Sequence, residues 1–297
     1  MNHNQLRSFH AVATEGGFTA ASRVLNVGQP TITTQVKALE RQYNVELFHR
    51  RGRRVELTDA GDSLFRMAKR IFSLEAEADD LLYDYGGFQT GHLRVGAVGP
   101  YHATEMLSVF HACYPGINLS VTVGNSMDMV RRLLDYSIDV AILAHVEDDP
   151  RIYAMPYSRH SVVVFVHKSH RFAKRRRIRL SELEGEPMVL REVGSTTRLA
   201  FETAIREAGV TIEPVMVIGS REAVWLAVAR GIGIGVVSNI EYLPHPDLHR
   251  VEVADADIYT TAHVNCLAER RESRLISAFF DVAEELKGAS KNAFPCS

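Results

Sequence analysis

Residues 17–40 read GFTAASRVLNVGQPTITTQVKALE. Thr19 is placed to cap a short helix, and residues 26–28 form a sharp turn because asparagine and glycine tolerate a left-handed backbone. Pro30 suits the first turn of a second helix. The apolar residues of that helix repeat at helical spacing and so face inward: Ile32, Val36 and Leu39. Two short helices joined by a tight turn indicate a helix-turn-helix.

The outer face of the second helix is polar, with one cation and no acid before Glu40. Short hydrogen-bonding side chains of this kind suit the major groove of DNA, although a plain solvated face would have a similar composition. The DNA contacts that we expect from this helix are Gln29, Pro30, Thr31, Thr33, Thr34 and Lys37. A further helix comes before the pair, with apolar residues at helical spacing: Leu6, Phe9, Val12 and Ala13.

A basic hairpin follows these helices. Residues 49–57 (HRRGRRVEL) have a glycine at the tip and alternate at their end, which predicts a β-hairpin or wing. Residues 1–57 hold eight Lys/Arg against four acids, a net charge of +4, whereas the whole chain carries −2. A solvated charged loop is the alternative. The arginines that we expect on DNA phosphates are Arg51, Arg53 and Arg54.

A long helix is predicted from Asp59 to about Tyr85, with Thr58 as its N-cap. Its apolar residues follow a 4,3 spacing that is typical of a coiled-coil seam: Leu64, Ala68, Ile71, Ala78, Leu82 and Tyr85. Such a helix spans roughly 40 Å, too long for a small winged-helix domain to cover alone. We therefore expect it to pair with a second copy of the chain, the alternative being a core helix within one subunit.

From His92 onward, apolar runs alternate with helical patterns, which indicates βαβ units and largely parallel sheets. The expected strands lie at 93–98, 119–123, 140–143, 162–166, 215–218 and 234–237. The motif at 227–235 ends in Gly-x-Gly-x-Gly, but these glycines follow a helix rather than precede one, which argues against a dinucleotide site. The fold class predicted for the chain is α/β with an N-terminal all-α-plus-wing domain.

Composition excludes several classes of protein. The N-terminus lacks a basic start followed by an apolar run, and no stretch of about 18 apolar residues occurs, so we expect a cytoplasmic protein outside the membrane. Three cysteines (Cys113, Cys266 and Cys296) are too few for a disulfide framework or a zinc cluster. His167 and His170 lack further metal ligands nearby, and the basic run 174–179 is most simply solvated surface. No cofactor is expected.

Several segments at fixed spacing resemble the LysR-type transcriptional regulators, and the resemblance covers essentially the whole chain. The matching segments are FHAVA at 9–13, GFTAAS at 17–22, Gln29-Pro30, Leu47 to Arg50 and LTDAG at 57–61. Family members usually carry serine before the Gln-Pro pair, whereas Gly28 stands here. The side-chain cap is lost, although glycine is an acceptable N-cap.

The resemblance implies a winged helix-turn-helix over 1–57, a dimerisation linker helix over 58–87 and an effector-binding domain over 88–297. That domain would have two lobes like those of type 2 periplasmic binding proteins, with the effector held between them. We place lobe one at 92–160 with 266–297, and lobe two at 161–265. The implied partners are a pseudo-palindromic double-stranded DNA operator, a second chain or a tetramer, and RNA polymerase.

Four stretches with glycine and small hydrogen-bonding side chains follow strands or begin helices, where open α/β sheets bind ligands. The residues that we expect to bind the effector are Gly99, Pro100, Tyr101, His102, Asn125, Ser126, Ser195, Thr196, Thr197, Arg198, Ser220 and Arg221. Hydroxyls at helix N-termini suit carboxylate, phosphate or phosphonate oxygens, so we expect a small anion. Simple helix capping is the alternative for each serine or threonine taken singly.

A narrower resemblance points to regulators of 2-aminoethylphosphonate breakdown, in which case Glu192 or Glu222 would meet the ammonium group. No acid/base pair, nucleophile motif or metal cluster indicates an enzyme. The function predicted from the sequence is therefore an effector-controlled, DNA-binding transcription regulator. Two alternatives stay open, a thiol-based redox regulator that uses Cys113 or Cys266 and a solute-binding α/β protein with an accessory helical domain.

Overall fold

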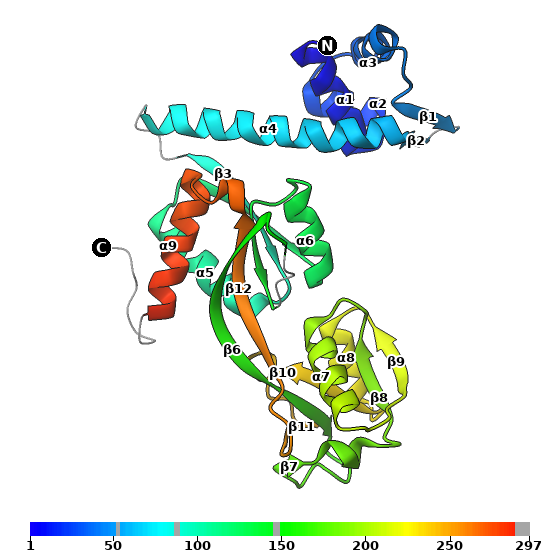
Figure 1. Cartoon of the computed structure of the whole chain (residues 1–297), viewed down its shortest axis with the longest axis vertical. Coiled ribbons are helices and arrows are strands. Elements are labelled where there is room, and N and C mark those ends of the chain that lie inside the picture. The colour runs from blue at the N-terminus through cyan, green and yellow to red at the C-terminus, as the bar shows by residue number, and fades with distance from the viewer. Residues whose placement is uncertain (52–53, 86–89, 145–148, 289–297) are drawn as a thin grey trace. The chain divides into compact units, whose positions relative to one another are not determined.

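The computed structural model describes residues 1–51, 54–85, 90–144 and 149–288 (Figure 1). The chain divides into two compact units, which we describe one at a time. The first unit contains Met1–Phe88 and the second contains nearly all of the remainder. In the described part of the chain, no helix is both long and apolar enough to cross a membrane.

The first unit is a three-helix domain with a wing. Its elements are α1 (His3–Glu15), α2 (Phe18–Leu25), α3 (Gln29–Tyr43), β1 (Phe48–Arg51) and β2 (Arg54–Leu57). Asn26 ends α2 in the left-handed conformation, at φ 52°, which makes the sharp turn into α3. The expected inward stripe of α3 is buried in the shared core, with Ile32, Val36 and Leu39 all almost fully covered.

The helix caps differ in part from the prediction. The second helix begins at Phe18 after Gly17, without a side-chain cap, so Thr19 does not cap it as we expected. The Thr19 hydroxyl instead donates to Gln29 Oε1 at 3.1 Å. As expected, Gly28 gives α3 no side-chain cap, and the Thr58 hydroxyl caps the long helix by accepting from the Gly61 amide at 3.0 Å.

The long helix α4 (Asp59–Tyr85) corrects the predicted seam. Ala68 is fully buried against the helix-turn-helix core, and Leu64 packs there too. The exposed apolar side chains keep Ile71, Ala78 and Leu82 of the predicted seam, and the others continue the stripe: Met67, Leu74 and Leu81. Leu64 and Ala68 leave the seam because α1 packs against α4 in the core that covers them.

Gly61 lies where α4 passes closest to the chain that enters the wing. A Cβ added to Gly61 would lie 2.1 Å from the Leu47 carbonyl oxygen, which is backbone and cannot rotate away. Gly61→Ala is therefore expected to destabilise the winged domain by about 1–3 kcal/mol. Thermal melts of the full chain measure this loss. In the control Gly17→Ala the new methyl group meets no described atom within 4 Å, and an equal loss in both variants would contradict the clash.

The second unit has two lobes built on one continuous set of strands (Figure 1). Lobe one has the strand order β4-β3-β5-β12-β6, and its elements are β3 (Gly91–Ala97), α5 (Pro100–Cys113), β4 (Ile117–Val123), α6 (Ser126–Leu134), β5 (Val140–Leu143) and α9 (Arg274–Gly288). Helices α5 and α9 pack together over one face of the sheet, while α6 covers the other.

Lobe two continues the strand order as β6-β10-β8-β9. Its elements are β7 (Arg177–Ile178), β8 (Met188–Arg191), α7 (Thr196–Glu207), β9 (Pro214–Ile218), α8 (Arg221–Ala229), β10 (Ile234–Ser238) and β11 (Leu248–Val253), with the short helices η1 (Leu180–Leu183) and η2 (Asn239–Glu241). Helix α7 packs on one side of the sheet and α8 on the other. A third short helix, η3 (Ala268–Arg270), comes before α9.

Two long strands, β6 (Ile152–His167) and β12 (Tyr259–Leu267), connect the lobes (Figure 1). They are antiparallel, because the chain leaves lobe one along the first and returns along the second. The sheets are therefore mixed rather than largely parallel. The return also comes earlier than the 265/266 boundary that we expected, since Ile258 packs in the lobe-two core and Val264 in the lobe-one core.

A buried ionic cluster lies inside lobe one. Asp139 is 5% exposed and accepts hydrogen bonds from the guanidinium groups of Arg94 at 2.6 Å and Arg270 at 2.8 Å. Arg270 is itself only 7% exposed. Burial alone would raise the pKa of Asp139, but the hydrogen bonds and charge of Arg94, together with the charge of Arg270, hold it below its ordinary value. The cluster ties β3 to the end of the returning strand.

Candidate functional site

The outer face of α3 is the first candidate surface. Gln29, Pro30, Thr31 and Thr34 are exposed, whereas Thr33 and Lys37 are half-buried. The Thr33 hydroxyl donates to the Gln29 carbonyl oxygen at 3.0 Å, so its proton is engaged within the helix. The bond from Thr19 orients the Gln29 side chain at the helix N-terminus. Gln29, Thr31 and Thr34 are therefore the side chains that the helix presents most openly.

The predicted wing is an antiparallel hairpin in which Arg51 pairs with Arg54 across the strands. Its backbone confirms the hairpin that the sequence predicted. Arg53 lies outside the described residues, and so do the side chains of Arg51 and Arg54. The expected phosphate contacts of these three arginines stay predictions.

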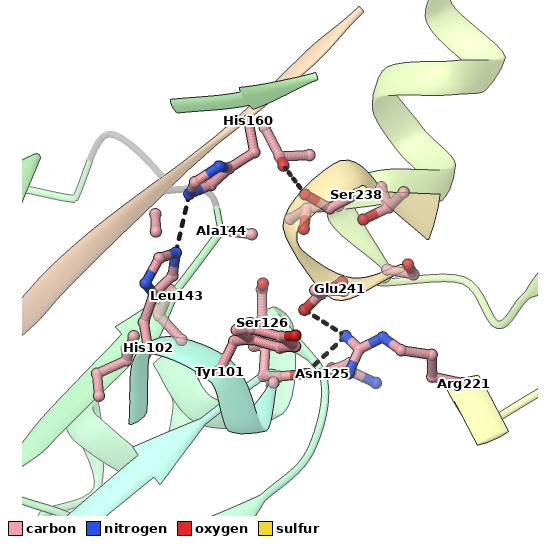
Figure 2. A pocket seen from close by; sticks show the side chains of 18 of the residues that line it. Tyr101, His102, Asn125, Ser126, Leu143, Ala144, His160, Arg221, Ser238 and Glu241 are labelled. Atoms are coloured by element: carbon pink, nitrogen blue, oxygen red, sulfur yellow. Dashed lines mark hydrogen bonds and ion pairs between the residues drawn. The ribbon is translucent and has the colours of Figure 1, made fainter. Parts of the chain in front are cut away.

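The second candidate site is a cleft between the two lobes, with an empty volume of about 630 Å³ that is partly open to solvent. Figure 2 shows the side chains that surround it. Nine of the residues that we expected to bind the effector line this cleft: Gly99, Tyr101, His102, Asn125, Ser126, Ser195, Thr196, Thr197 and Arg221. They come from both lobes, at the starts of α5, α6, α7 and α8.

Three expected residues do not line the cleft. Pro100 and Ser220 line neighbouring hollows, and the Ser220 hydroxyl caps α8 and donates to Glu222 Oε2 at 2.7 Å. The Arg198 guanidinium is held away from the cleft by Glu202 Oε1 and by the Arg191 carbonyl oxygen, each at 2.7 Å. The Ser220 hydroxyl and the Arg198 guanidinium, which we expected to bind the effector, therefore form hydrogen bonds within lobe two instead.

The helix N-termini differ in how their serines are used. Ser195 caps α7 by accepting from the Arg198 amide, so capping and cleft lining combine there. At α6 the capping acceptor is Asn125, whose Oδ1 accepts from the Asp128 amide at 2.9 Å. Ser126 is 7% exposed, lines the cleft, and its hydroxyl has no hydrogen-bond partner among the described residues. A buried unpaired hydroxyl is costly unless a ligand or water pairs with it.

The guanidinium groups of the cleft already have anionic partners. Arg221 contacts Glu241 Oε1 at 2.8 Å and donates to the Val98 carbonyl oxygen of lobe one at 3.2 Å. Arg191 is paired with Glu192 at 2.7 Å. Burial raises the pKa of Glu241, and the charges of Arg221 and Arg191 partly offset that rise. An anion in the cleft would therefore depend more on hydroxyls and helix N-termini than on unpaired arginines.

Two histidines meet at the side of the cleft away from Arg221 (Figure 2). His102 Nε2 and His160 Nε2 lie 2.9 Å apart, and the Ser158 hydroxyl lies 3.0 Å from the first and 2.8 Å from the second. Burial, with a smaller effect of His160, lowers the pKa of His102 to about 4. Burial also lowers the pKa of His160.

Sequence reasoning missed part of the cleft. The missed side chains that can form hydrogen bonds or carry charge are His160, Arg191, Ser238, Glu241 and Thr260. None of them directly follows a glycine at the end of a parallel strand, which was the signal that we used. His160 and Thr260 lie opposite one another on the connecting strands, and that pairing was not visible in either segment alone.

Comparison with protein families gives two matches. Residues 3–62 match the bacterial regulatory helix-turn-helix protein model of the lysR family, and residues 86–287 match the LysR substrate binding domain. The chain belongs to the LysR family. This LysR regulator is thus a DNA-binding transcription regulator rather than an enzyme.

Relatives of this LysR regulator are regulators as well. It is 32% identical over 276 residues to the RuBisCO operon transcriptional regulator of Allochromatium vinosum, covering 92% of this chain and 91% of that protein. It is also 32% identical over 237 residues to the HTH-type transcriptional activator CmpR of Synechocystis sp. (strain ATCC 27184 / PCC 6803 / Kazusa), covering 79% and 78%.

Solved structures confirm the predicted fold class. CbnR, a LysR family transcriptional regulator, matches with a TM-score of 0.72 at 22% identity, covering 98% of this chain and all of that one. CbnR has also been solved with its target DNA. A full-length OxyR variant from Pseudomonas aeruginosa matches with a TM-score of 0.76 at 21% identity over 96% of this LysR regulator and 95% of that chain.

The structure argues against Cys266 as the sensor of a thiol-based redox regulator. Cys266 is fully buried in β12, and burial raises the pKa of its thiol to about 12. A thiol of that kind carries almost no thiolate near neutral pH, so it reacts slowly with oxidants. Cys113 lies at the end of α5 and packs against the lobe-one core.

Proposed function

We propose that this LysR regulator senses a small oxyanion in the interlobe cleft. The observation that carries the proposal is the buried hydroxyl of Ser126, which faces the cleft at the first turn of α6 without a partner in the described chain. The N-terminus of α7 contributes Ser195, Thr196 and Thr197 from the opposite lobe. Free amides at the two helix N-termini and these hydroxyls suit the oxygens of a carboxylate, phosphate or phosphonate.

Binding measurements on the full chain test this site with inorganic phosphate, sulfate, succinate and 2-aminoethylphosphonate as probes. Ser126→Ala is expected to weaken the tightest-binding probe about 10- to 100-fold, since hydrogen bonds to charged groups contribute about 1.5–3 kcal/mol. The control is Thr203→Ala, which lies on α7 outside the cleft. The site would be refuted if no oxyanion bound, or if affinity were the same with and without the Ser126 hydroxyl.

A phosphonate that carries an amine is the narrower form of this proposal. Glu192 and Glu222 do not line the cleft, so they are poorly placed for the ammonium group that we assigned to them. Glu241 does line it. One of the relatives reported above is named as a RuBisCO operon regulator, and a phosphorylated effector fits the same oxyanion site. Comparing the affinities for ethylphosphonate and 2-aminoethylphosphonate tests whether the amine contributes to binding, because the two probes differ only in the amine.

We further propose a two-fold dimer through α4, whose exposed apolar residues include Met67 at 65% and Leu82 at 68% exposure. Pairing of the sensing domains would extend the dimer to a tetramer. A two-fold dimer reads a pseudo-palindromic operator, and Arg51, Arg53 and Arg54 would contact its phosphates. We also propose contact with RNA polymerase and a cytoplasmic location, because a transcription regulator acts where its DNA is transcribed.

A further inference from the structure

The cluster of His102, Ser158 and His160 is the part of the cleft that the proposed oxyanion site does not use. His102 belongs to the first turn of α5, while Ser158 and His160 lie two residues apart on β6, so their side chains point to the same face of the strand. The three polar atoms lie within 3.0 Å of one another. Both imidazoles line the cleft.

A hydrogen bond between two imidazole nitrogens needs one N–H and one bare nitrogen. One Nε2 therefore carries the shared proton, and the ring whose Nε2 is bare keeps its own proton on Nδ1 when it is neutral. His102 Nδ1 faces Glu105 Oε2, so we assign the bare Nε2 to His102 and the donor to His160. The lowered pKa of each ring agrees with two neutral rings near neutral pH. A proton added to His102 Nε2 would leave two N–H groups facing each other, with the Ser158 oxygen and any added acceptor as their partners.

The surroundings of the cluster carry little positive charge of their own. On α5, Glu105 Oε2 lies 4.0 Å from His102 Nδ1. On β6, Tyr157 packs edge-on against His102 and its hydroxyl donates to Glu105 at 3.5 Å, while the Arg159 guanidinium stacks on Tyr259 instead. On β12, Thr260 is paired with His160, and the His263 ring binds the Thr261 carbonyl oxygen. Glu105 favours a protonated His102, whereas burial opposes it.

We propose that His102, Ser158 and His160 form a second oxyanion subsite of the cleft, which takes up one proton from solvent when the ligand binds. The proposal rests on the oxyanion-sensing function above and adds its proton linkage. The ligand oxygen replaces the shared hydrogen bond. His160 Nε2–H donates to it in place of His102 Nε2, and the proton taken up at His102 Nε2 makes the second donor, while His102 Nδ1 keeps its proton towards Glu105. The negative charge of the ligand offsets the cost of charging a buried imidazole.

The coupling between proton binding and ligand binding determines how ligand affinity changes with pH. Because the bound ligand raises the pKa of the pair, affinity is highest at low pH. It falls as pH rises between the pKa of the free pair and that of the bound pair, by up to about tenfold per pH unit. Above the pKa of the bound pair, ligand binding no longer takes up a proton. The occupancy of the cleft thus responds both to the ligand concentration and to the pH.

Isothermal titration of the full chain with sulfate tests this, because sulfate does not titrate near neutral pH and any proton must come to the protein. Titrations at about pH 6 in buffers of different ionisation heat give the number of protons bound, which is expected to be about one. His102→Gln keeps a nitrogen donor but cannot titrate, and is expected to abolish the uptake while sulfate still binds. His92→Gln, a histidine of the same lobe bonded to Ser120, should leave it unchanged.

The outcomes separate the two proposals. Sulfate binding with no buffer-dependent heat would overturn the proton linkage and leave the oxyanion site standing. Proton uptake that survived His102→Gln would overturn it too, since the proton would then belong to another group. Loss of uptake in His102→Gln, with binding retained, supports the subsite. Absence of binding by every oxyanion of the panel would overturn both proposals together.

Discussion

Replacing Gln29 with alanine is expected to lower operator affinity by at least about 30-fold, because a good side-chain contact to a base edge contributes about 1–3 kcal/mol and a two-fold dimer loses two of them, about 2–6 kcal/mol in all. Gln29 is exposed at the start of α3, and its side chain is oriented by the Thr19 hydroxyl. A glutamine amide can pair with adenine in the major groove. Fluorescence anisotropy measures the loss on a duplex that the wild-type chain has selected from a random pool.

The control for this substitution is Gln42→Ala, which removes the same side chain from the exposed last turn of the same helix. Its affinity should stay within about threefold of wild type, since surface substitutions of this kind change free energies by about 0.5 kcal/mol. Binding of Gln29→Ala to an unrelated duplex should keep its salt dependence, because phosphate contacts are unchanged. Equal losses on both duplexes would show that Gln29 does not read sequence.

The second large effect concerns Asp139. Asp139→Asn is expected to lower the free energy of unfolding of the effector domain by about 3–5 kcal/mol, because it removes the buried carboxylate charge that Arg94 and Arg270 both contact. Thermal or urea unfolding of the full chain, followed in the transition of this domain, measures the loss. Asp149→Asn is the control, since its partner Arg151 is on the surface. A loss of similar size in both variants would contradict the special role of burial.

The same carboxylate predicts how stability depends on pH. The folded pKa of Asp139 lies below its ordinary value, so the stabilisation is fully present above the unfolded pKa. It is lost as pH falls through the folded pKa, when the carboxylate takes up a proton. The wild type should therefore lose stability on acidification, while Asp139→Asn should lose less over the same range.

The sequence predicted those elements whose signal is local. The inward stripe of α3 and the glycine segments at strand ends and helix starts are each signals within a few residues. The stripe is buried as predicted, and nine of the twelve residues expected from the glycine segments line the cleft. The seam of α4 was right for Ile71, Ala78 and Leu82 and wrong for Leu64 and Ala68, because the same apolar spacing serves two surfaces and only packing against α1 shows which residues are taken. Arg198 failed because a guanidinium has two nearby acceptors within its own lobe.

Residues that depend on long-range pairing could not be predicted in this way. His160 reaches the cleft because β6 pairs with β12, about 100 residues later in the chain, and the two strands bring both lobes to one edge. His102 was expected at the cleft on local grounds, but its partner was not. The hydroxyl of Ser126 was expected there too, yet its lack of a partner among the described residues became visible only once Asn125 was seen to cap α6.

The paired connecting strands also bear on how such regulators diversify. Ser161 and Tyr259 are direct partners across β6 and β12, so the chain leaves and re-enters lobe one at neighbouring points, about 5 Å apart. Everything between them is one uninterrupted segment of the gene. A single recombination event can thus exchange the lobe-two lining of the cleft as one segment, while the helix-turn-helix is kept unchanged.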